Sequence, residues 1–115
     1  MFLEMVKRKD KNSKTIDRFL KRVKEEIDID KVILFGSEAK GRQKKWSGVD
    51  LAIISDDFEK MNFHKRLGFL GMIAWYAKTT EIEALGYTLD EYKNATKLDF
   101  LGEIKRTGKI IYQKN

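Results

Sequence analysis

The 115-residue chain contains no cysteine, no proline and only one histidine. The lack of cysteine excludes disulfide bonds and thiolate metal sites, and it makes a reducing cytoplasm the compartment that we expect. No apolar run approaches the length of a membrane span, and the apolar start at residues 1–6 is short and interrupted by Glu4. We therefore expect neither a membrane segment nor a secretory signal. No linker composition divides the chain, so we predict one domain over residues 1–115, with residues 1–11 as a basic N-terminal arm.

Charge is the compositional property that is in excess. Charged residues make up 37% of the chain, and the formal net charge is +6. A positive balance favours polyanionic partners such as a nucleoside triphosphate (NTP) or a nucleic acid. A solvated charged surface, as in Lys/Glu-rich proteins from hot environments, is the more ordinary explanation. Composition alone therefore leaves both interpretations open.

Apolar residues alternate between strand-like runs and helical spacing along the chain. Thr88, with Glu91 three residues later, has the form of a capping box at a helix start. This alternation predicts an α/β (α+β) domain with a mixed twisted sheet and helices mainly on one side. The strands are expected at 31–35, 49–54, 81–87 and 109–112, and the helices at about 13–27, 37–40, 62–77, from 88, and 98–106.

Two segments carry the strongest chemical signal. An apolar strand at Val32–Phe35 ends in Gly36-Ser37. Ten residues later, at Ser47-Gly48, the chain leads into a second strand, which begins at Val49 and carries Asp50 near its start. Because glycine lacks a Cβ, a phosphate can approach the backbone closely, and the N–H groups at the start of the following helix face the anion. Asp50 is placed to offer a metal ligand toward the same phosphates. This layout is typical of a nucleoside triphosphate site.

At these residues the chain resembles the minimal nucleotidyltransferases, small relatives of the DNA polymerase beta superfamily. The family pattern is Gly-Ser or Gly-Gly after a strand, about ten residues, and then Asp-x-Asp flanked by apolar residues. Gly36, Ser37 and Asp50 match this pattern, whereas Gly48 stands where the first aspartate is expected. The chain therefore resembles a divergent member of the family.

The resemblance continues downstream and covers roughly residues 15–112. Glu83 occupies the position of a third carboxylate on a later strand, and residues 88–92 match the helix start that follows it in the family. Residues 102–112 look like the closing helix and the final short strand. The match to the family is thus spread over nearly the whole chain.

This resemblance implies metal-dependent transfer of a nucleoside monophosphate from an NTP, with ATP expected, to a hydroxyl acceptor. It implies that Asp50 and Glu83 act as catalytic residues and ligate magnesium. Residues expected to bind the nucleotide are Gly36, Ser37, Lys40 and Arg42. Many family members also pair with a helical HEPN-domain protein as antitoxin and toxin, so a partner of that kind is expected here.

Gly48 leaves this chain with two of the three carboxylates that hold a pair of metal ions in such a site. Asp56 lies six residues beyond Asp50, about 20 Å along an extended strand, and is out of reach. Glu38 is the nearer candidate for a substitute ligand. Glu83 is one methylene longer than aspartate, which shifts its oxygens by about 1.5 Å. We therefore expect reduced magnesium affinity and weak or lost transfer, with an active enzyme using a substitute ligand as the alternative.

Other residues allow further functions. Trp46, with Lys44 and Lys45, suits stacking on a base and contact with phosphate, so a basic nucleic-acid-binding module is another alternative. A solvated loop explains the same residues. His64 has no acid partner at hydrogen-bond spacing, and we expect no catalytic role for it.

The predicted helix at 62–77 is apolar around more than its inner stripe. We expect that stripe to consist of Leu67, Leu70, Ile73 or Ala74, and Ala77. Further apolar residues on the same helix are Phe69, Met72, Trp75 and Tyr76. A helix of this kind is either deeply buried or exposes a patch, and an exposed patch indicates a partner protein or a homo-oligomer.

Overall fold

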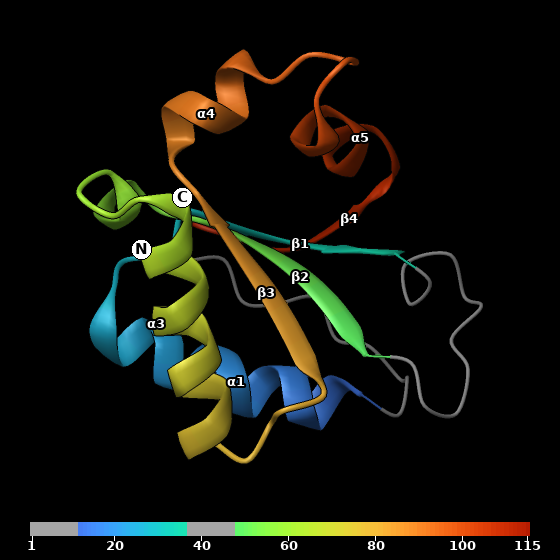
Figure 1. Ribbon diagram of the computed structural model, residues 1–115. Coiled ribbons are helices and arrows are strands. Elements are labelled where there is room, and N and C mark those ends of the chain that lie inside the picture. The colour runs from blue at the N-terminus through green and yellow to red at the C-terminus, as the bar shows by residue number, and fades with distance from the viewer. Residues whose placement is uncertain (1–11, 37–47) are drawn as a thin grey trace.

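The computed structural model describes residues 12–36 and 48–115, which form a four-stranded sheet and the helices that cover it (Figure 1). The strand order is β3-β2-β1-β4, with β1 antiparallel to β2 and β4, and β2 parallel to β3. The predicted mixed sheet is thus confirmed. In chain order the elements are α1 (Ser13–Glu26), β1 (Lys31–Phe35), β2 (Val49–Ile54), the 3-10 helix η1 (Asp56–Phe58), α3 (Phe63–Tyr76), β3 (Ile82–Tyr87), α4 (Leu89–Asn94), α5 (Phe100–Thr107) and β4 (Lys109–Gln113).

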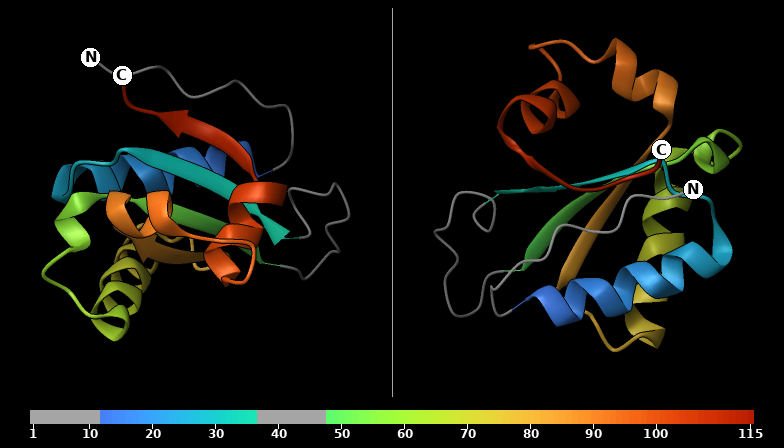
Figure 2. Two further views of the ribbon diagram at one scale, coloured as in Figure 1. Left: turned by 90° about the horizontal axis from the view of Figure 1, so that it is seen from above. Right: turned by 180° about the vertical axis from the view of Figure 1, so that it is seen from behind.

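The helices form two unequal layers on the sheet. The two long helices, α1 and α3, lie on one face, and the short helices α4 and α5 lie on the other, as the views from the front and from behind agree (Figures 1 and 2). The large hydrophobic core lies under α1 and α3, and a smaller one lies under α5. The two long helices thus lie on one side of the sheet as predicted, and the two short helices lie on the other.

α1 is held by a single apolar face. Its buried residues Ile16, Phe19, Leu20 and Val23 recur at intervals of three and four, so they fall on one side of a helix. Asn12 precedes the helix as predicted, although its side chain makes no capping hydrogen bond. Burial of this face against the sheet, and not the cap, holds α1 in place.

The alternation of side chains along β2 decides which face Asp50 occupies. Val49, Leu51 and Ile53 belong to the large core, whereas Ala52 belongs to the small core under α5. Because successive strand residues point to opposite faces, Asp50 lies on the same face as Ala52. The candidate site therefore lies on the side of the sheet that carries the short helices.

The inner stripe of α3 differs from the predicted one. Leu70, Ala74 and Ala77 are buried as expected, but Leu67 is 37% exposed, and buried Arg66 occupies the stripe one turn before Leu70. Arg66 is tolerated there because its guanidinium group finds several oxygen partners, described below. The expectation that Leu67 lies inward is thus wrong, since the stripe follows positions 66, 70 and 74.

The C-terminal elements follow the sequence prediction closely. Thr88 and Glu91 form the predicted capping box, in which each side chain accepts a hydrogen bond from the other residue's backbone N–H. α5 ends at Gly108, and β4 pairs with β1 at one edge of the described sheet. Along the parts of the chain that the structure describes, no helix has both the length and the apolar character needed to cross a membrane.

Candidate nucleotide and metal site

Strand pairing brings the two predicted catalytic carboxylates together. In the parallel pairing of β2 with β3, Asp50 stands directly opposite Glu83. Adjacent strands lie about 4.8 Å apart, so side chains at paired positions on one face are neighbours. Residues separated by more than thirty positions in the sequence thus form one acidic pair.

Gly36, at the end of β1, packs against the Asp50 carboxylate of this pair. Its φ is +75°, in the left-handed region that favours glycine. A Cβ at this position would lie 2.4 Å from Oδ2 of Asp50. Both the backbone conformation and the close approach of the carboxylate therefore require glycine at the end of β1, where the sequence predicts a phosphate-binding turn.

The environment of Asp50 disfavours its charged form. Burial raises the pKa of Asp50 from 3.8 to about 6, and both the charge of Glu83 and a hydrogen bond with Glu83 act in the same direction. A bound cation would favour the ionised carboxylates, because it neutralises the repulsion between them. A buried carboxylate pair with a raised pKa is typical of functional sites, including sites that bind a cation.

Gly48 lies directly against this pair. A Cβ added to Gly48 would lie 3.4 Å from Cδ and from Oε1 of Glu83, and 3.0 Å from the carbonyl oxygen of Glu81. Among the described glycines, only Gly36 has a positive φ, so a left-handed turn does not account for Gly48. The position where an aspartate is expected thus adjoins the acidic pair, but no side chain projects from it.

The acidic pair opens into a hollow of about 480 Å³ that is lined by residues of α5 and, around the edge strand β3, by residues of α3. Its walls are mainly apolar, and Phe35 and Phe100 meet edge to face there with ring centroids 5.9 Å apart. The hollow is lined by Phe35, Asp50, Leu67, Gly71, Ile82, Glu83, Ala84, Leu85 and Phe100. Leu67, expected in the core, instead forms part of this wall.

The donor set fits one divalent cation better than two. Asp50 and Glu83 supply carboxylate oxygens, the ligands that magnesium prefers. Within residues 12–36 and 48–115, no group of three or more acidic or histidine side chains is placed to hold a metal ion. The described residues therefore do not fit the pair of metal ions used by nucleotidyl transfer.

Several predicted site residues lie outside the described residues. These are Ser37, Lys40 and Arg42 of the nucleotide site, Glu38 as the substitute ligand, and Lys44, Lys45 and Trp46 of the basic loop. Within the described residues, His64 is exposed at the start of α3, and Asp56 accepts a hydrogen bond from the backbone N–H of Leu89 at 3.1 Å. Asp56 thus interacts with the α4 region, and the expectation that it lies out of reach of Asp50 stays a prediction.

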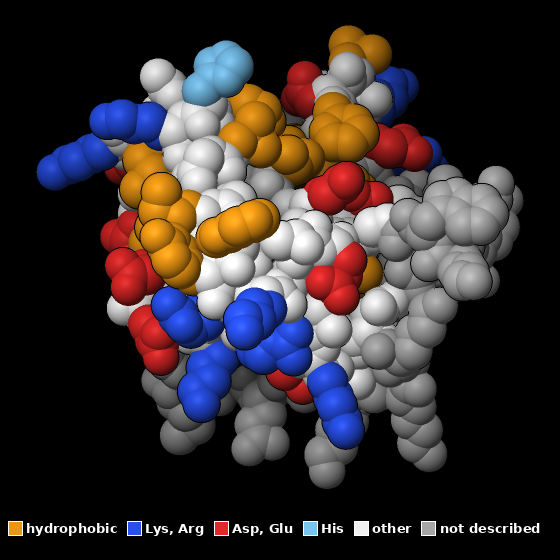
Figure 3. Space-filling model, turned by 60° about the horizontal axis from the view of Figure 1, so that its bottom comes forward, with side chains coloured by type: hydrophobic (Ala, Val, Ile, Leu, Met, Phe, Trp, Pro, Cys, Tyr) orange, Lys and Arg blue, Asp and Glu red, His pale blue; other side chains and the backbone are white. Residues whose placement is uncertain are grey.

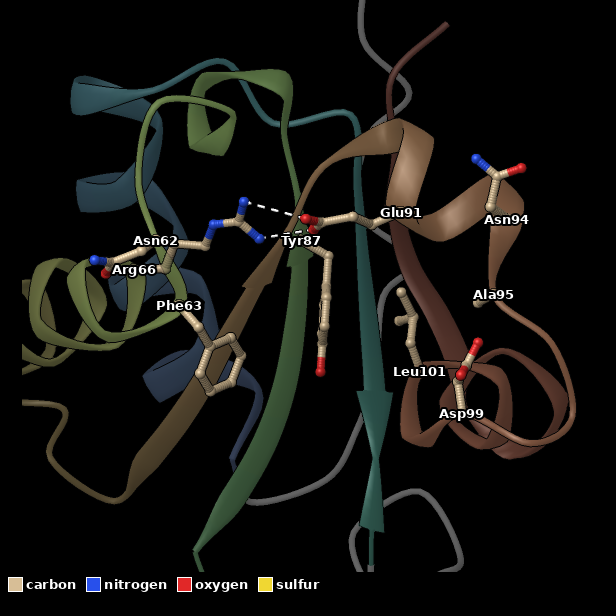
Figure 4. Close-up of a pocket in the computed structure, with 9 residues that line it drawn as sticks. All are labelled: Asn62, Phe63, Arg66, Tyr87, Glu91, Asn94, Ala95, Asp99 and Leu101. Atoms are coloured by element: carbon tan, nitrogen blue, oxygen red, sulfur yellow. Dashed lines mark hydrogen bonds and ion pairs between the residues drawn. The ribbon is translucent and has the colours of Figure 1, made fainter.

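A second hollow, also of about 480 Å³, lies farther along β3 between the start of α3 and α4 and α5 (Figure 4). At its inner end Arg66 forms a bidentate ion pair with Glu91, with nitrogen–oxygen distances of 2.7 and 3.2 Å. Arg66 also donates to the carbonyl oxygens of Phe58, Met61 and Gly86. Sequence reasoning missed Arg66, although its place one turn before Leu70 and two before Ala74 was a usable signal.

The outer face of α3 exposes the apolar residues that its sequence left unassigned. Met72, Trp75 and Tyr76 are 61%, 71% and 66% exposed. Hydrophobic side chains gather over this helix, with Lys and Arg side chains beside them (Figure 3). Of the two outcomes predicted for this helix, the structure has the exposed patch.

Comparisons with known proteins agree with this geometry. Residues 14–115 match the family model described as Polymerase beta, Nucleotidyltransferase. A search of functionally curated proteins gave no match. Among the solved structures that match, two that share the fold at low sequence identity are the following.

The first is the crystal structure of a candidate nucleotidyltransferase from Sulfolobus solfataricus, with 15% identity and a TM-score of 0.60 over 84% of this chain and 76% of that one. The second is a chain from a toxin-antitoxin crystal structure with AMP-PNP, with 18% identity and a TM-score of 0.62 over 86% of this chain and 73% of that one. The family match begins in the first turn of α1 and continues through β4. The chain therefore belongs to the polymerase beta-type nucleotidyltransferase family.

Proposed function

We propose that this protein is a nucleotide-binding and partner-binding member of its family, with an antitoxin-like role and with nucleotidyl transfer that is weak or lost. The observation that carries this proposal is the two-carboxylate site: Asp50 and Glu83 face each other, while Gly48 offers no third ligand. Binding of one cation and one nucleotide needs fewer ligands than transfer, which uses two aligned metal ions.

The nucleotide, which we expect to be ATP, binds where β1 ends beside Asp50. Gly36 provides the close approach to the backbone, and Ser37, Lys40 and Arg42 are proposed to contact the phosphates. The similarity to a structure solved with AMP-PNP supports this assignment. The apolar hollow beside Phe35 and Phe100 is placed to receive a ring next to the phosphates.

Magnesium is proposed to bind between Asp50 and Glu83, with reduced affinity. When bound, it supplies positive charge that neutralises the phosphates of the nucleotide. Asp50 and Glu83 contribute one carboxylate each, and the burial that raises the pKa of Asp50 makes cation binding compete with a proton. Binding should therefore strengthen as pH rises through about 6.

A transfer assay separates this proposal from an active enzyme with a substitute ligand. Calorimetry with ATP, GTP, CTP and UTP, each with Mg²⁺ or Mn²⁺, measures binding, and labelled ATP with candidate acceptors measures transfer. We expect weak nucleotide binding that Asp50→Asn reduces, and little label transfer. The control Glu59→Gln removes an exposed carboxylate elsewhere and should leave binding unchanged. Robust transfer by the unmodified chain would overturn the inactive assignment.

The partner is proposed to dock on the apolar outer face of α3. Its exposed Met72, Trp75 and Tyr76 form a patch of the kind that marks a protein interface. The similarity to a toxin-antitoxin structure supports a protein partner, and a helical HEPN-type protein is the partner proposed, with self-association as the alternative.

A pull-down with the product of the adjacent reading frame tests the partner half of the proposal. Trp75→Ser should reduce capture of the partner at least tenfold, because a large aromatic residue that becomes buried in an interface often contributes most of the binding energy. Leu98→Ser is the matched control, since Leu98 is 89% exposed in the loop between α4 and α5. A monomer in solution that captures no helical protein would remove this half and leave the nucleotide half standing.

A further inference from the structure

Gly48 and Glu83 both depart from the pattern of the site, and the structure places the two departures in contact. A Cβ on Gly48 would lie 3.4 Å from both Cδ and Oε1 of Glu83. The carboxyl group at the end of the longer glutamate thus lies over the α-carbon of the glycine. A side chain at position 48 would therefore enter the space next to the Glu83 carboxylate.

A left-handed backbone conformation does not explain the glycine, because Gly48 has no positive φ. The backbone oxygen of Glu81 lies 3.0 Å from the added Cβ, which is tight but requires a shift of only a few tenths of an ångström. What a longer side chain at position 48 must displace is the Glu83 carboxylate.

We infer that Gly48 and Glu83 are a matched pair, in which the absence of a side chain at position 48 makes the room that the longer Glu83 uses to bring its carboxylate to Asp50. Gly48 is then a positioning residue that acts through Glu83. The inference rests on the geometry of the acidic pair, and it deepens the proposed cation site without requiring that any transfer occurs.

This matched pair predicts that restoring an aspartate alone does not restore the site. In Gly48→Asp, a third carboxylate enters beside Glu83, where like charges repel and the longer side chain has lost its room. In Glu83→Asp, the shorter side chain withdraws from Asp50 and leaves the space over Gly48 unused. Only the double variant supplies two short carboxylates that share the space.

The test is a double-mutant cycle over Gly48→Asp and Glu83→Asp, read by Mn²⁺ calorimetry and by the melting temperature without metal. Gly48→Asp alone should lower the melting temperature by about 5 °C or more. Glu83→Asp alone should weaken Mn²⁺ binding roughly tenfold. In the double variant both losses should shrink, with Mn²⁺ affinity at or above that of the unmodified protein.

Gly48→Ala isolates the steric part, because it adds the Cβ without a charge. It should weaken Mn²⁺ binding roughly tenfold while changing the melting temperature by only about 2 °C. Gly68→Ala is the matched control, since a Cβ at Gly68 meets nothing within 4 Å, and it should leave Mn²⁺ binding unchanged.

The outcomes separate this inference from the proposed function. Additive effects in the cycle, on both melting temperature and Mn²⁺ affinity, would overturn the matched pair. If the unmodified protein binds no Mn²⁺, the cation half of the proposed function fails, and the coupling in melting temperature alone decides the inference. If Gly48→Ala binds Mn²⁺ as well as the unmodified protein, Glu83 does not depend on the room at position 48.

Discussion

Two acidic groups on the same side of the sheet lie in opposite electrostatic settings. Asp50 faces a second carboxylate across β2 and β3, and burial, with help from Glu83, raises its pKa to about 6. For Glu91, burial acts to raise the pKa, but hydrogen bonds from Arg66 and Thr88, together with the charge of Arg66, hold it below its ordinary value. The charged form of Asp50 is destabilised by burial and by Glu83, whereas the charged form of Glu91 is stabilised by Arg66 and Thr88.

The difference separates a site built for a ligand from a site built for folding. The pair of Arg66 and Glu91 is complete within the chain, because the guanidinium group also satisfies three carbonyl oxygens. Among the residues that the structure describes, no Lys or Arg forms an ion pair with Asp50 or Glu83, and a cation from outside would complete this acidic pair. A carboxylate pair that is unfavourable without its ligand is a functional candidate, whereas a satisfied one ties α3 to α4.

The largest expected effect comes from breaking the satisfied pair. Arg66→Met should lower the free energy of unfolding by about 3 kcal/mol, because it leaves several oxygens without their donor. Urea denaturation measures the change. The control Arg22→Met removes a half-exposed arginine paired with Glu25 and should cost under about 0.5 kcal/mol. Equal costs for the two variants would contradict the structural role of Arg66.

Glu91→Gln should cost less, about 1.5 kcal/mol at pH 7, since the Glu91 side chain is 45% exposed. The pKa of Glu91 is lower in the folded state than in the unfolded state, so its ionised form stabilises the fold above the ordinary carboxyl pKa of 4.5. That contribution disappears as pH falls. The difference between the unmodified protein and the variant, followed by denaturation, should therefore shrink below about pH 4.5. A difference that grows on acidification would reverse the assignment.

Asp50→Asn should change stability in the opposite direction. The folded pKa of Asp50 is raised to about 6, so ionisation opposes folding, and the penalty develops between pH 3.8 and about 6. The variant should be more stable than the unmodified protein at pH 8 by about 1 kcal/mol or less after solvent screening, and equal to it near pH 3.5. Thermal unfolding at the two pH values measures this. Destabilisation at pH 8 would mean that the acidic pair is not strained without a cation.

Sequence reasoning predicted the fold, and it singled out Asp50 and Glu83, which the structure brings together, but it did not predict the surroundings of Asp50. The period of apolar residues placed α1, β2 and β3 closely, because side-chain burial imposes that period locally. The acidic pair was also predictable, because the resemblance aligned Asp50 and Glu83 with the family. That Glu83 lies against Gly48 depends on how β2 and β3 pair, which no local pattern records.

The satisfied pair was missed for the same physical reason. Glu91 was assigned to the capping box from its spacing to Thr88, which is a local signal. Its second partner, Arg66, lies 25 residues earlier on α3, so only the tertiary fold brings the two together. The sequence signal for this pair was Arg66 itself, a charged residue within the apolar stripe of a predicted helix. It was overlooked because Leu67, one position along, fits a helical stripe almost as well.

The smallest expected effect on stability comes from breaking an exposed ion pair, which serves as a reference for the buried one. Arg106 and Glu103 form an ion pair on α5 whose side chains are 66% and 50% exposed. Glu103→Gln should change the free energy of unfolding by under about 0.5 kcal/mol, because water competes for both groups. Urea denaturation beside Glu91→Gln gives the ratio of the two effects, which should be about three or more. If the exposed pair contributed as much as the pair of Arg66 and Glu91, burial would not determine how strongly a charged group affects stability in this protein. The burial that raises the pKa of Asp50 would then no longer indicate an incomplete site.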